Sequence, residues 1–182
     1  MTYRPRMSSE EEIALTGGRI TKGVVRVSNT VRRPVGAYSE YVHRVLDHLA
    51  VLGLTWVPRY LGQDDQDREI LTFQPGVVPE PLPRGRWAEP QVRVAATFLR
   101  GLPDATAGSL LAAGRPVVCH NDFGPHNLVF SAGTPPAESG RAQIEGLPTG
   151  VIDFDQVSPG EREDDLAYAA CCGFSGPRLS GN

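Results

Sequence analysis

The chemistry of this chain is concentrated in two short segments, HNDFGPHN at residues 120–127 and GVIDFD at residues 150–155. In the first, Asp122 and Asn127 lie five positions apart, so one loop offers both a carboxylate and an amide. In the second, Asp153 follows an apolar strand that would hold its carboxylate rigidly. Carboxylate and amide oxygens suit Mg²⁺, and a carboxylate can accept the proton of an attacking hydroxyl. Together the segments predict a site for phosphoryl transfer, which needs charge neutralisation and an oriented acceptor.

These two segments also resemble the motifs of a known enzyme family. His-x-Asp-x-x-x-x-Asn followed by a strand-end Asp is similar to the protein kinase set. Asn121 and Pro125 inside the loop, IDFD in place of DFG, and Asp-Leu-Ala at residues 165–167 resemble the aminoglycoside phosphotransferase and choline kinase family. The resemblance is dense over residues 118–170 and thinner over residues 17–76.

This resemblance implies roles for the site residues. Asp122 would be the catalytic base, and the cofactors would be ATP or GTP with Mg²⁺. Asn127 and Asp153 would hold the metal ions, with Asp155 as a second metal contact or a brace of the loop. Two further residues would be structural, His120 beneath the loop and Asp165 as its brace. Asp and Asn also cap turns for purely structural reasons, but an ordered set of motifs favours a site.

The resemblance also implies an α+β, protein kinase-like fold with two lobes. We expect an N-terminal nucleotide-binding lobe at residues 1–76, with a five-stranded antiparallel sheet and one helix. A linker would follow at residues 77–90. A mainly helical catalytic lobe at residues 91–182 would contain the catalytic hairpin.

Local patterns support this architecture. Strand-like runs separated by turn residues fill residues 13–34, and VPRYLGQ and REILTF read as two more strands. Between these two groups, apolar residues at i, i+3 and i+4 predict a helix that Ser39 can cap and Gly53 can end. Further helices are expected near residues 91–100 and 105–113. NLVF and TGVIDF should pair as the hairpin.

The N-terminal half offers candidate nucleotide contacts. In TVRRP, either Arg32 or Arg33 would bind phosphate, and Arg32 is favoured because it follows an apolar position. Arginine can bind phosphate through two nitrogens, although a solvated strand end is the alternative. Glu40 is either an ion-pairing glutamate or an acid favoured by the helix dipole, and both interpretations stay open.

Four further residues are candidates because of their positions. Gly17 and Gly18 stand where a phosphate-covering loop is expected, although an ordinary hairpin turn would also use them. Thr72 and Phe73 lie in the expected hinge at residues 71–74, where adenine would bind main-chain groups.

Two other chemistries are weaker. Cys119 beside His120 suggests a thiol nucleophile, but adjacent residues on a strand point to opposite faces. His120, His126 and Asp122 could form a transition-metal site, but no fourth ligand stands at a familiar spacing. Three cysteines, two of them adjacent, favour reduced thiols over a disulfide framework.

Composition and charge limit which kinds of partner and which cellular location we expect. A net charge of −3 argues against binding nucleic acid by bulk electrostatics. No apolar run approaches the roughly 20 residues of a membrane span, and the N-terminus lacks a secretory signal. We therefore expect a cytoplasmic protein whose partner is a small molecule with a hydroxyl group, and a homodimer stays open.

The C-terminus departs from the resemblance. The family continues beyond Asp-Leu-Ala with helices that line the acceptor pocket, whereas this sequence ends at Asn182 after FSGPRLSGN. We expect the fold to be incomplete there, which leaves two hypotheses. One is a phosphotransferase that transfers the γ-phosphoryl group of ATP to an aminoglycoside-like or amino-alcohol acceptor. The other is a catalytically inactive, nucleotide-binding remnant. The acidic run at residues 161–165 would favour a cationic acceptor, or it is a solvated loop.

Overall fold

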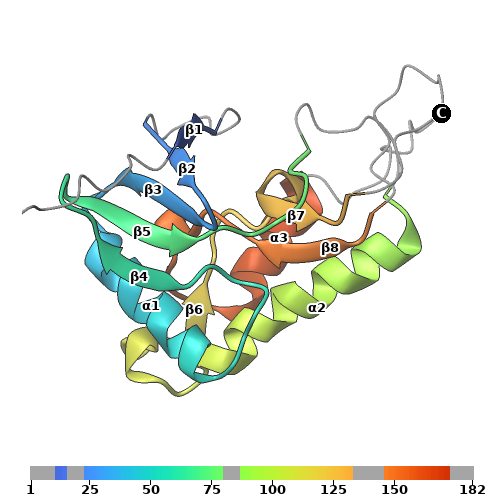
Figure 1. The fold of residues 1–182 in the computed structure, drawn as a ribbon. Helices are drawn as coiled ribbons and strands as arrows, with labels where there is room; N and C mark the ends of the chain where they lie inside the picture. The colour runs from blue at the N-terminus through green and yellow to red at the C-terminus, as the bar shows by residue number, and fades with distance from the viewer. Residues whose placement is uncertain (1–10, 16–22, 80–86, 133–145, 173–182) are drawn as a thin grey trace, which may run out of the picture. The chain divides into compact units, whose positions relative to one another are not determined.

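The computed structural model describes residues 11–15, 23–79, 87–132 and 146–172 (Figure 1). It is an α+β protein with an antiparallel sheet, which confirms the predicted class. The chain forms two compact units. The first contains residues 1–35 and 60–73, and the second contains residues 36–59 and 74–182.

The first unit is built on a five-stranded sheet in the order β1-β2-β3-β5-β4, with every neighbouring pair antiparallel. Its strands are β1 (Glu12–Ala14), β2 (Val25–Val27), β3 (Thr30–Pro34), β4 (Tyr60–Gln63) and β5 (Arg68–Thr72). The turn between β4 and β5 is closed by Asp64, whose Oδ1 accepts hydrogen bonds from the amides of Gln66 and Arg68. Such Asx turns explain why an acidic segment joins these strands.

Helix α1 (Ser39–Val51) follows the predicted apolar stripe, with Val42, Val45, Leu46 and Leu49 buried. The Ser39 hydroxyl accepts a hydrogen bond from the Gly36 amide, so it stabilises the turn before the helix instead of capping it. Gly53 ends the helix at a φ of 78°, a conformation that favours glycine. The helix belongs to the second unit, where His48 Nε2 donates to the Ala105 carbonyl at 2.9 Å.

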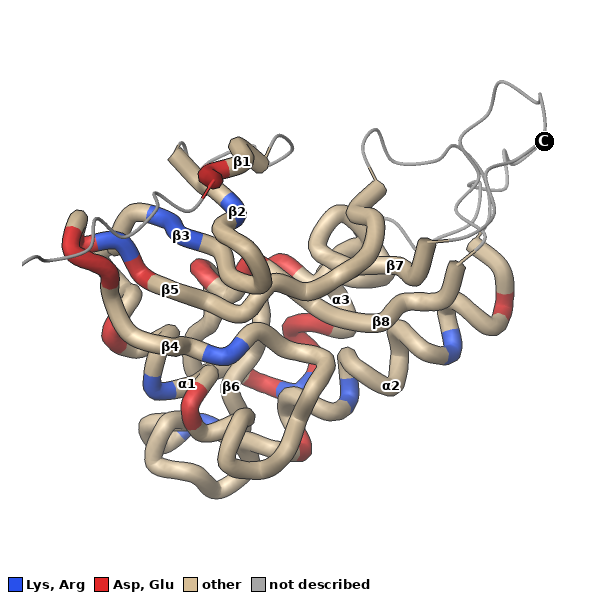
Figure 2. The backbone as a smooth tube through the Cα atoms, in the orientation of Figure 1, with Lys and Arg blue, Asp and Glu red and all other residues tan. Residues whose placement is uncertain are grey.

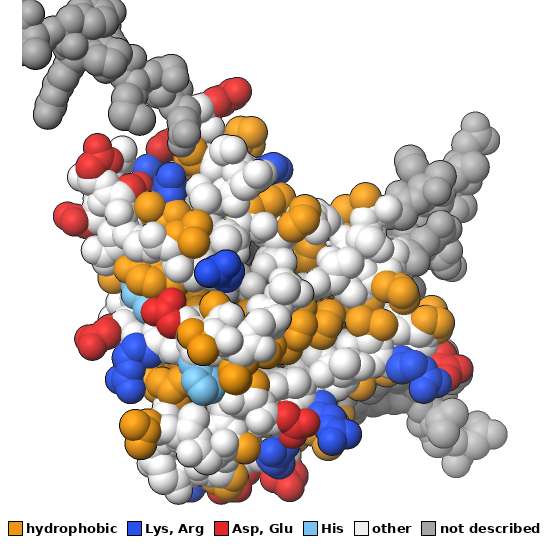
Figure 3. Space-filling view, turned by 60° about the horizontal axis from the view of Figure 1, so that its bottom comes forward, with side chains coloured by type: hydrophobic (Ala, Val, Ile, Leu, Met, Phe, Trp, Pro, Cys, Tyr) orange, Lys and Arg blue, Asp and Glu red, His pale blue; other side chains and the backbone are white. Residues whose placement is uncertain are grey.

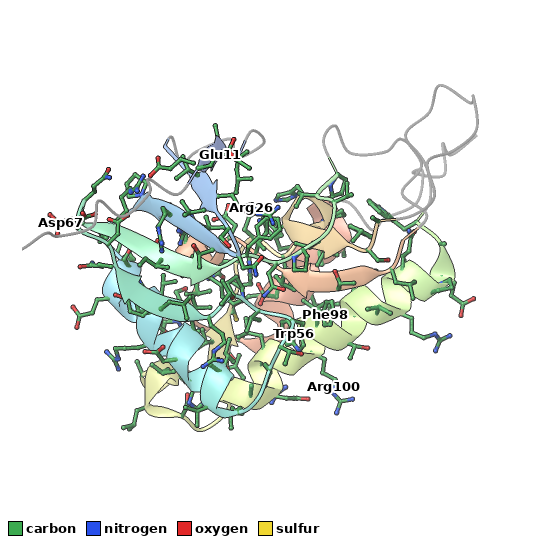
Figure 4. The ribbon with its side chains drawn as sticks, in the orientation of Figure 1. Glu11, Arg26, Trp56, Asp67, Phe98 and Arg100 are labelled. Atoms are coloured by element: carbon green, nitrogen blue, oxygen red, sulfur yellow. The ribbon has the colours of Figure 1, made fainter. Side chains whose placement is uncertain are left out.

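The helix predicted near residues 91–100 is present as α2 (Glu89–Thr106), which is longer than predicted and runs through Pro103. The second helix predicted near residues 105–113 was wrong, because α2 extends to Thr106 and only a short 3-10 turn, η1 (Leu110–Ala112), follows. Proline has no backbone N–H, so one hydrogen bond of the helix is missing at Pro103. The helix tolerates this loss because packing stabilises it. Trp56 stacks on Phe98 of α2 with ring centroids 4.9 Å apart (Figure 4).

Two small antiparallel sheets complete the second unit. The predicted hairpin pairs β7 (Leu128–Phe130) with β8 (Pro148–Val151). The second sheet, which the sequence did not predict, pairs β6 (Val117–Cys119) with β9 (Ser158–Gly160). Helix α3 (Arg162–Cys172) packs against β6 and α2. Short turns η2 (Pro125–Asn127) and η3 (Phe154–Gln156) follow β6 and β8 respectively.

The core of the second unit lies around β6 and β7, whose residues are all buried. Hydrophobic side chains also reach the surface among charged ones (Figure 3), and Leu110 and Val51 are 94% and 86% exposed. Among the described helices, none has both the length and the apolar composition that crossing a bilayer requires.

Candidate active site

Helix α3 anchors the backbone of the loop that follows β6. Asp165 is 1% exposed, and its two carboxylate oxygens accept hydrogen bonds from the amides of His120 and Asn121, both at 2.7 Å. Hydrogen bonds to a buried carboxylate are among the stronger ones in proteins. The start of the loop is therefore fixed by a residue 45 positions later in the chain.

His120 is fully buried beneath the loop. Its ring meets those of Phe123 and Phe154 edge-on, and its Nε2 donates to the Ile152 carbonyl at 3.1 Å. Nδ1 is buried and has no hydrogen-bond partner in the described structure. Burial lowers the pKa of His120, because a proton on Nδ1 would be both desolvated and unpaired.

Asn121 turns the chain through a left-handed conformation with a φ of 62°, which asparagine tolerates better than most residues. Its Nδ2 donates to the Gln156 carbonyl at 2.8 Å and to Ser158 Oγ at 2.9 Å. This side chain ties the loop to the segment after Asp153. The unusual residue in the middle of the motif therefore has a structural reason.

Asp122 is the centre of a cluster of hydrogen bonds. Its Oδ1 accepts from His126 Nε2 at 3.0 Å and from the Tyr168 hydroxyl, and its Oδ2 accepts from Asn127 Nδ2 at 2.9 Å. Burial alone raises the pKa of this carboxyl, but the hydrogen bonds from Tyr168 and His126, the His126 charge and the Asn127 amide outweigh burial. The pKa of Asp122 is thus lowered, and the group is an anion at neutral pH.

Asn127 is oriented in a way that fits a magnesium ligand. Both hydrogens of its Nδ2 are used within the loop, on the Asp122 backbone carbonyl at 3.0 Å and on the Asp122 carboxylate. The side-chain oxygen takes no part in these two hydrogen bonds, and amide oxygens suit Mg²⁺. Within the described ranges, no group of three His, Cys, Asp or Glu residues could hold a metal.

Asp153 is placed beside this loop by a backbone hydrogen bond of its neighbour, Ile152. The amide of Ile152 donates to the Asn127 carbonyl at 2.9 Å, so the segment with Asp153 follows directly beside Asn127. Asp153 has a φ of 64°, which is rare for a residue with a side chain and often marks functional positions. Asp155 lies in the first turn of η3. Shared binding of an ion by Asn127, Asp153 and Asp155 stays a prediction.

Arg32 and Arg33 are neighbours in β3, whose basic segment is drawn blue in Figure 2. Because successive side chains of a strand alternate, the two arginines point to opposite faces of the sheet. Arg33 is paired across the strands with Glu69, which is 1% exposed, at an Nε–Oε1 distance of 2.5 Å. Arg32 Nε lies 3.9 Å from Asp64 Oδ2. Glu69 was not identified from the sequence. The alternation of the strand REILT places Glu69 on the same buried face as Leu71. A phosphate contact of Arg32 or Arg33 stays a prediction.

The other nucleotide candidates lie as follows. Glu40 is exposed in the first turn of α1. Thr72 ends β5, and the Phe73 amide donates to the Asn29 carbonyl at 2.9 Å. The Arg26 guanidinium also makes a cation–π contact with the Phe73 ring, with its Cζ 3.9 Å from the ring centroid. Gly17 and Gly18 are outside the described residues.

Cys119 is unsuited to nucleophilic chemistry. Its side chain is fully buried and its thiol donates to the Glu161 carbonyl at 3.0 Å. Burial raises the pKa of Cys119 to about 12, whereas a nucleophilic cysteine needs a thiolate.

Two residues of the Asp122 cluster were not assigned to it from the sequence. His126 entered only as a ligand of a transition metal, and Tyr168 was not considered. A signal existed for Tyr168, because on a helix it is one turn after Asp165 and so shares its face. For His126 the signal is its position four residues after Asp122 in the same loop.

The buried His120 predicts a loss of stability in mild acid. Its pKa is lowered in the folded state, so the unfolded chain takes up a proton first as the pH falls below about 6.5. The His120 contribution is complete above that pH and declines below it, by up to about 1.4 kcal/mol per pH unit. Asp122 has a lowered pKa and titrates in a separate, more acidic window.

Urea unfolding between pH 7.5 and 5.5 measures this effect. Wild type and a His43→Gln control should lose stability in parallel, whereas His120→Gln should start lower and change less. An equal slope in all three proteins would show that His120 does not carry the pH dependence.

Comparison with known proteins agrees with this geometry. The model of the phosphotransferase enzyme family matches residues 80–179. The trifolitoxin immunity protein of Rhizobium leguminosarum bv. trifolii is 33% identical over 175 residues, an alignment that covers 87% of this chain. The chain spans 60% of the length of that relative.

The match to the family model covers more than half of the chain and includes the loop with Asp122 and Asn127, the hairpin and the segment with Asp165. On this evidence the chain belongs to the phosphotransferase enzyme family.

Proposed function

We propose that this protein transfers the γ-phosphoryl group of ATP to a hydroxyl of a small molecule. One observation supports this most directly. The ionised carboxylate of Asp122 is fixed by three donors beside an Asn127 amide whose oxygen takes no part in these hydrogen bonds. A carboxylate that is held in place and ionised at neutral pH can receive the proton of an attacking alcohol.

In this proposal Asp122 orients the acceptor hydroxyl and accepts its proton. Asn127, Asp153 and Asp155 would hold Mg²⁺, which supplies charge neutralisation at the phosphates. Asp165 and His120 hold the loop so that the carboxylate of Asp122 has a defined position. GTP in place of ATP stays open.

The proposed fold is kinase-like with two lobes, bounded near residues 76 and 90 as the sequence predicts. The nucleotide would be bound by Arg32 or Arg33, with contributions from Glu40, the glycines at 17 and 18, and main-chain groups near Thr72 and Phe73. We further propose a cytoplasmic location and, as partner, a small molecule that carries a hydroxyl group. Aminoglycoside-like and amino-alcohol acceptors are the first to test.

A second candidate is nucleotide binding without turnover. The relative with 33% identity is named for immunity to a toxin and not for phosphoryl transfer, which favours this alternative. A toxin as the phosphate acceptor is a third outcome that the same relative suggests.

The test combines binding with turnover. Purified protein is incubated with γ-labelled ATP, with and without Mg²⁺, and with a panel of aminoglycosides, amino alcohols and sugars. Label transfer and a Mg²⁺-dependent thermal shift with ATP are expected. A thermal shift without turnover of any acceptor would favour the second candidate, and the absence of any ATP effect would contradict both.

A further inference from the structure

The side chain of Asp122 is held from two directions. His126 and Asn127 reach it from its own loop, whereas Tyr168 reaches it from α3, 46 positions later. The same helix fixes the backbone of the loop through Asp165. Tyr168 and Asp165 are one turn apart, so one face of α3 holds both the loop and its carboxylate.

The hydrogen bonds leave little of the carboxylate free. An ionised carboxylate has about four acceptor positions, two on each oxygen. Among the described residues, Oδ1 accepts two hydrogen bonds, from His126 and Tyr168, and Oδ2 accepts one, from Asn127. The one acceptor position that these contacts leave is therefore the second position of Oδ2, the oxygen that Asn127 also contacts.

We propose that Tyr168 is a positioning residue: by occupying Oδ1 it directs Oδ2 of Asp122 to the acceptor hydroxyl. This inference rests on the proposed function. Without the phenol, Oδ1 keeps only the hydrogen bond from His126, so the carboxylate is held less firmly against rotation about its Cβ–Cγ bond. The acceptor is then bound in more than one orientation, and fewer of these are in line with the phosphoryl group.

Tyr168→Phe removes only the hydroxyl and tests this role. Its kcat should fall about 10- to 100-fold, as expected when a reacting group is displaced by about 1 Å. The KM for ATP should stay unchanged, because Tyr168 is not among the nucleotide contacts. Tyr41→Phe is the matched control. The hydroxyl of Tyr41 also donates one hydrogen bond, to the Leu111 carbonyl at 2.9 Å, and Tyr41 has no role in the proposed reaction.

Tyr41→Phe should lower thermal stability to a similar extent as Tyr168→Phe and leave kcat and KM unchanged. If both variants lose kcat equally, or if Tyr168→Phe loses activity only in proportion to folded protein, the positioning role is wrong.

A second measurement does not depend on turnover. The chain has five tyrosines, and labelling each at Cζ with ¹³C gives resonances that report the hydrogen bond of each phenol. Tyr168→Phe identifies the Tyr168 signal by its disappearance. Asp122→Ala should move that signal and leave the Tyr41 signal in place, whereas an unmoved Tyr168 signal would overturn the proposal.

The two measurements separate the two ways of failing. If wild type transfers no phosphate to any acceptor or water, the proposed function fails and the positioning role fails with it, yet the resonances still show whether Tyr168 holds Asp122. If turnover is present and the Tyr168 signal does not respond, only the inference about Tyr168 is overturned.

Discussion

Asp122→Asn should remove most phosphoryl transfer and leave nucleotide binding nearly intact. The loss expected for a general base is about 10²–10⁴-fold in turnover. Asparagine has the same shape and its oxygen can still accept from Tyr168 and His126, but it cannot take a proton from an alcohol. Its NH2 group cannot accept the hydrogen bond that Asn127 donates to Oδ2 of Asp122. ATP affinity should persist because the proposed nucleotide contacts lie on other residues.

Turnover, ATP affinity and melting temperature are measured on one preparation. Asp104→Asn is the control, since Asp104 is an exposed carboxylate paired with Arg100 and Arg162, and its loss should change none of the three values. If Asp122→Asn instead lowers the melting temperature and activity falls only with the folded fraction, Asp122 has a structural role.

Asp165→Asn should destabilise the whole chain and also reduce turnover. The side-chain amide has one acceptor oxygen in place of two, so one of the buried amides of His120 and Asn121 loses its partner. Hydrogen bonds to a charged group contribute about 1.5–3 kcal/mol, and the unpaired amide adds a cost, so a loss of about 3 kcal/mol is expected. In a chain of this size, that lowers Tm by roughly 6–12 °C.

The adjacent Asp164 provides a control of the same chemistry. It is exposed, and its Oδ2 accepts one hydrogen bond, from the Glu161 amide at 2.8 Å. Asp164→Asn should cost about 1 kcal/mol or less, as for the loss of a helix cap. Denaturant unfolding of both variants measures the difference, and equal losses would contradict the role given to Asp165.

Local patterns in the sequence were sufficient to predict part of this site. The five-residue spacing of Asp122 and Asn127 predicted that one loop carries both side chains, and in the structure Oδ2 and Nδ2 of this loop lie 2.9 Å apart. The apolar period of α1 and the hairpin of β7 and β8 were also readable, because each depends on neighbouring residues.

Other contacts join residues that are distant in sequence, where local patterns are less informative. The spacing of Asp165 and Tyr168 places both on one face of α3, but the position of that face beside Asp122 depends on how α3 packs on β6. The β6–β9 pairing likewise joins two three-residue strands, too short for an alternating pattern. Helix α2 continues through Pro103 although proline has a low helical propensity, because packing outweighs that propensity.

The dependence of the catalytic loop on α3 has a consequence for the order in which the protein matures. The hydrogen bonds from His120 and Asn121 to Asp165 close segments of 45 and 44 residues, and such closures cost chain entropy before they are rewarded. During synthesis from the N-terminus, a nascent chain that has emerged only as far as Asp155 contains the complete pair of motifs but cannot arrange them. We therefore expect the loop to become ordered only after α3 has left the ribosome, because Asp165 supplies the acceptor for both amides.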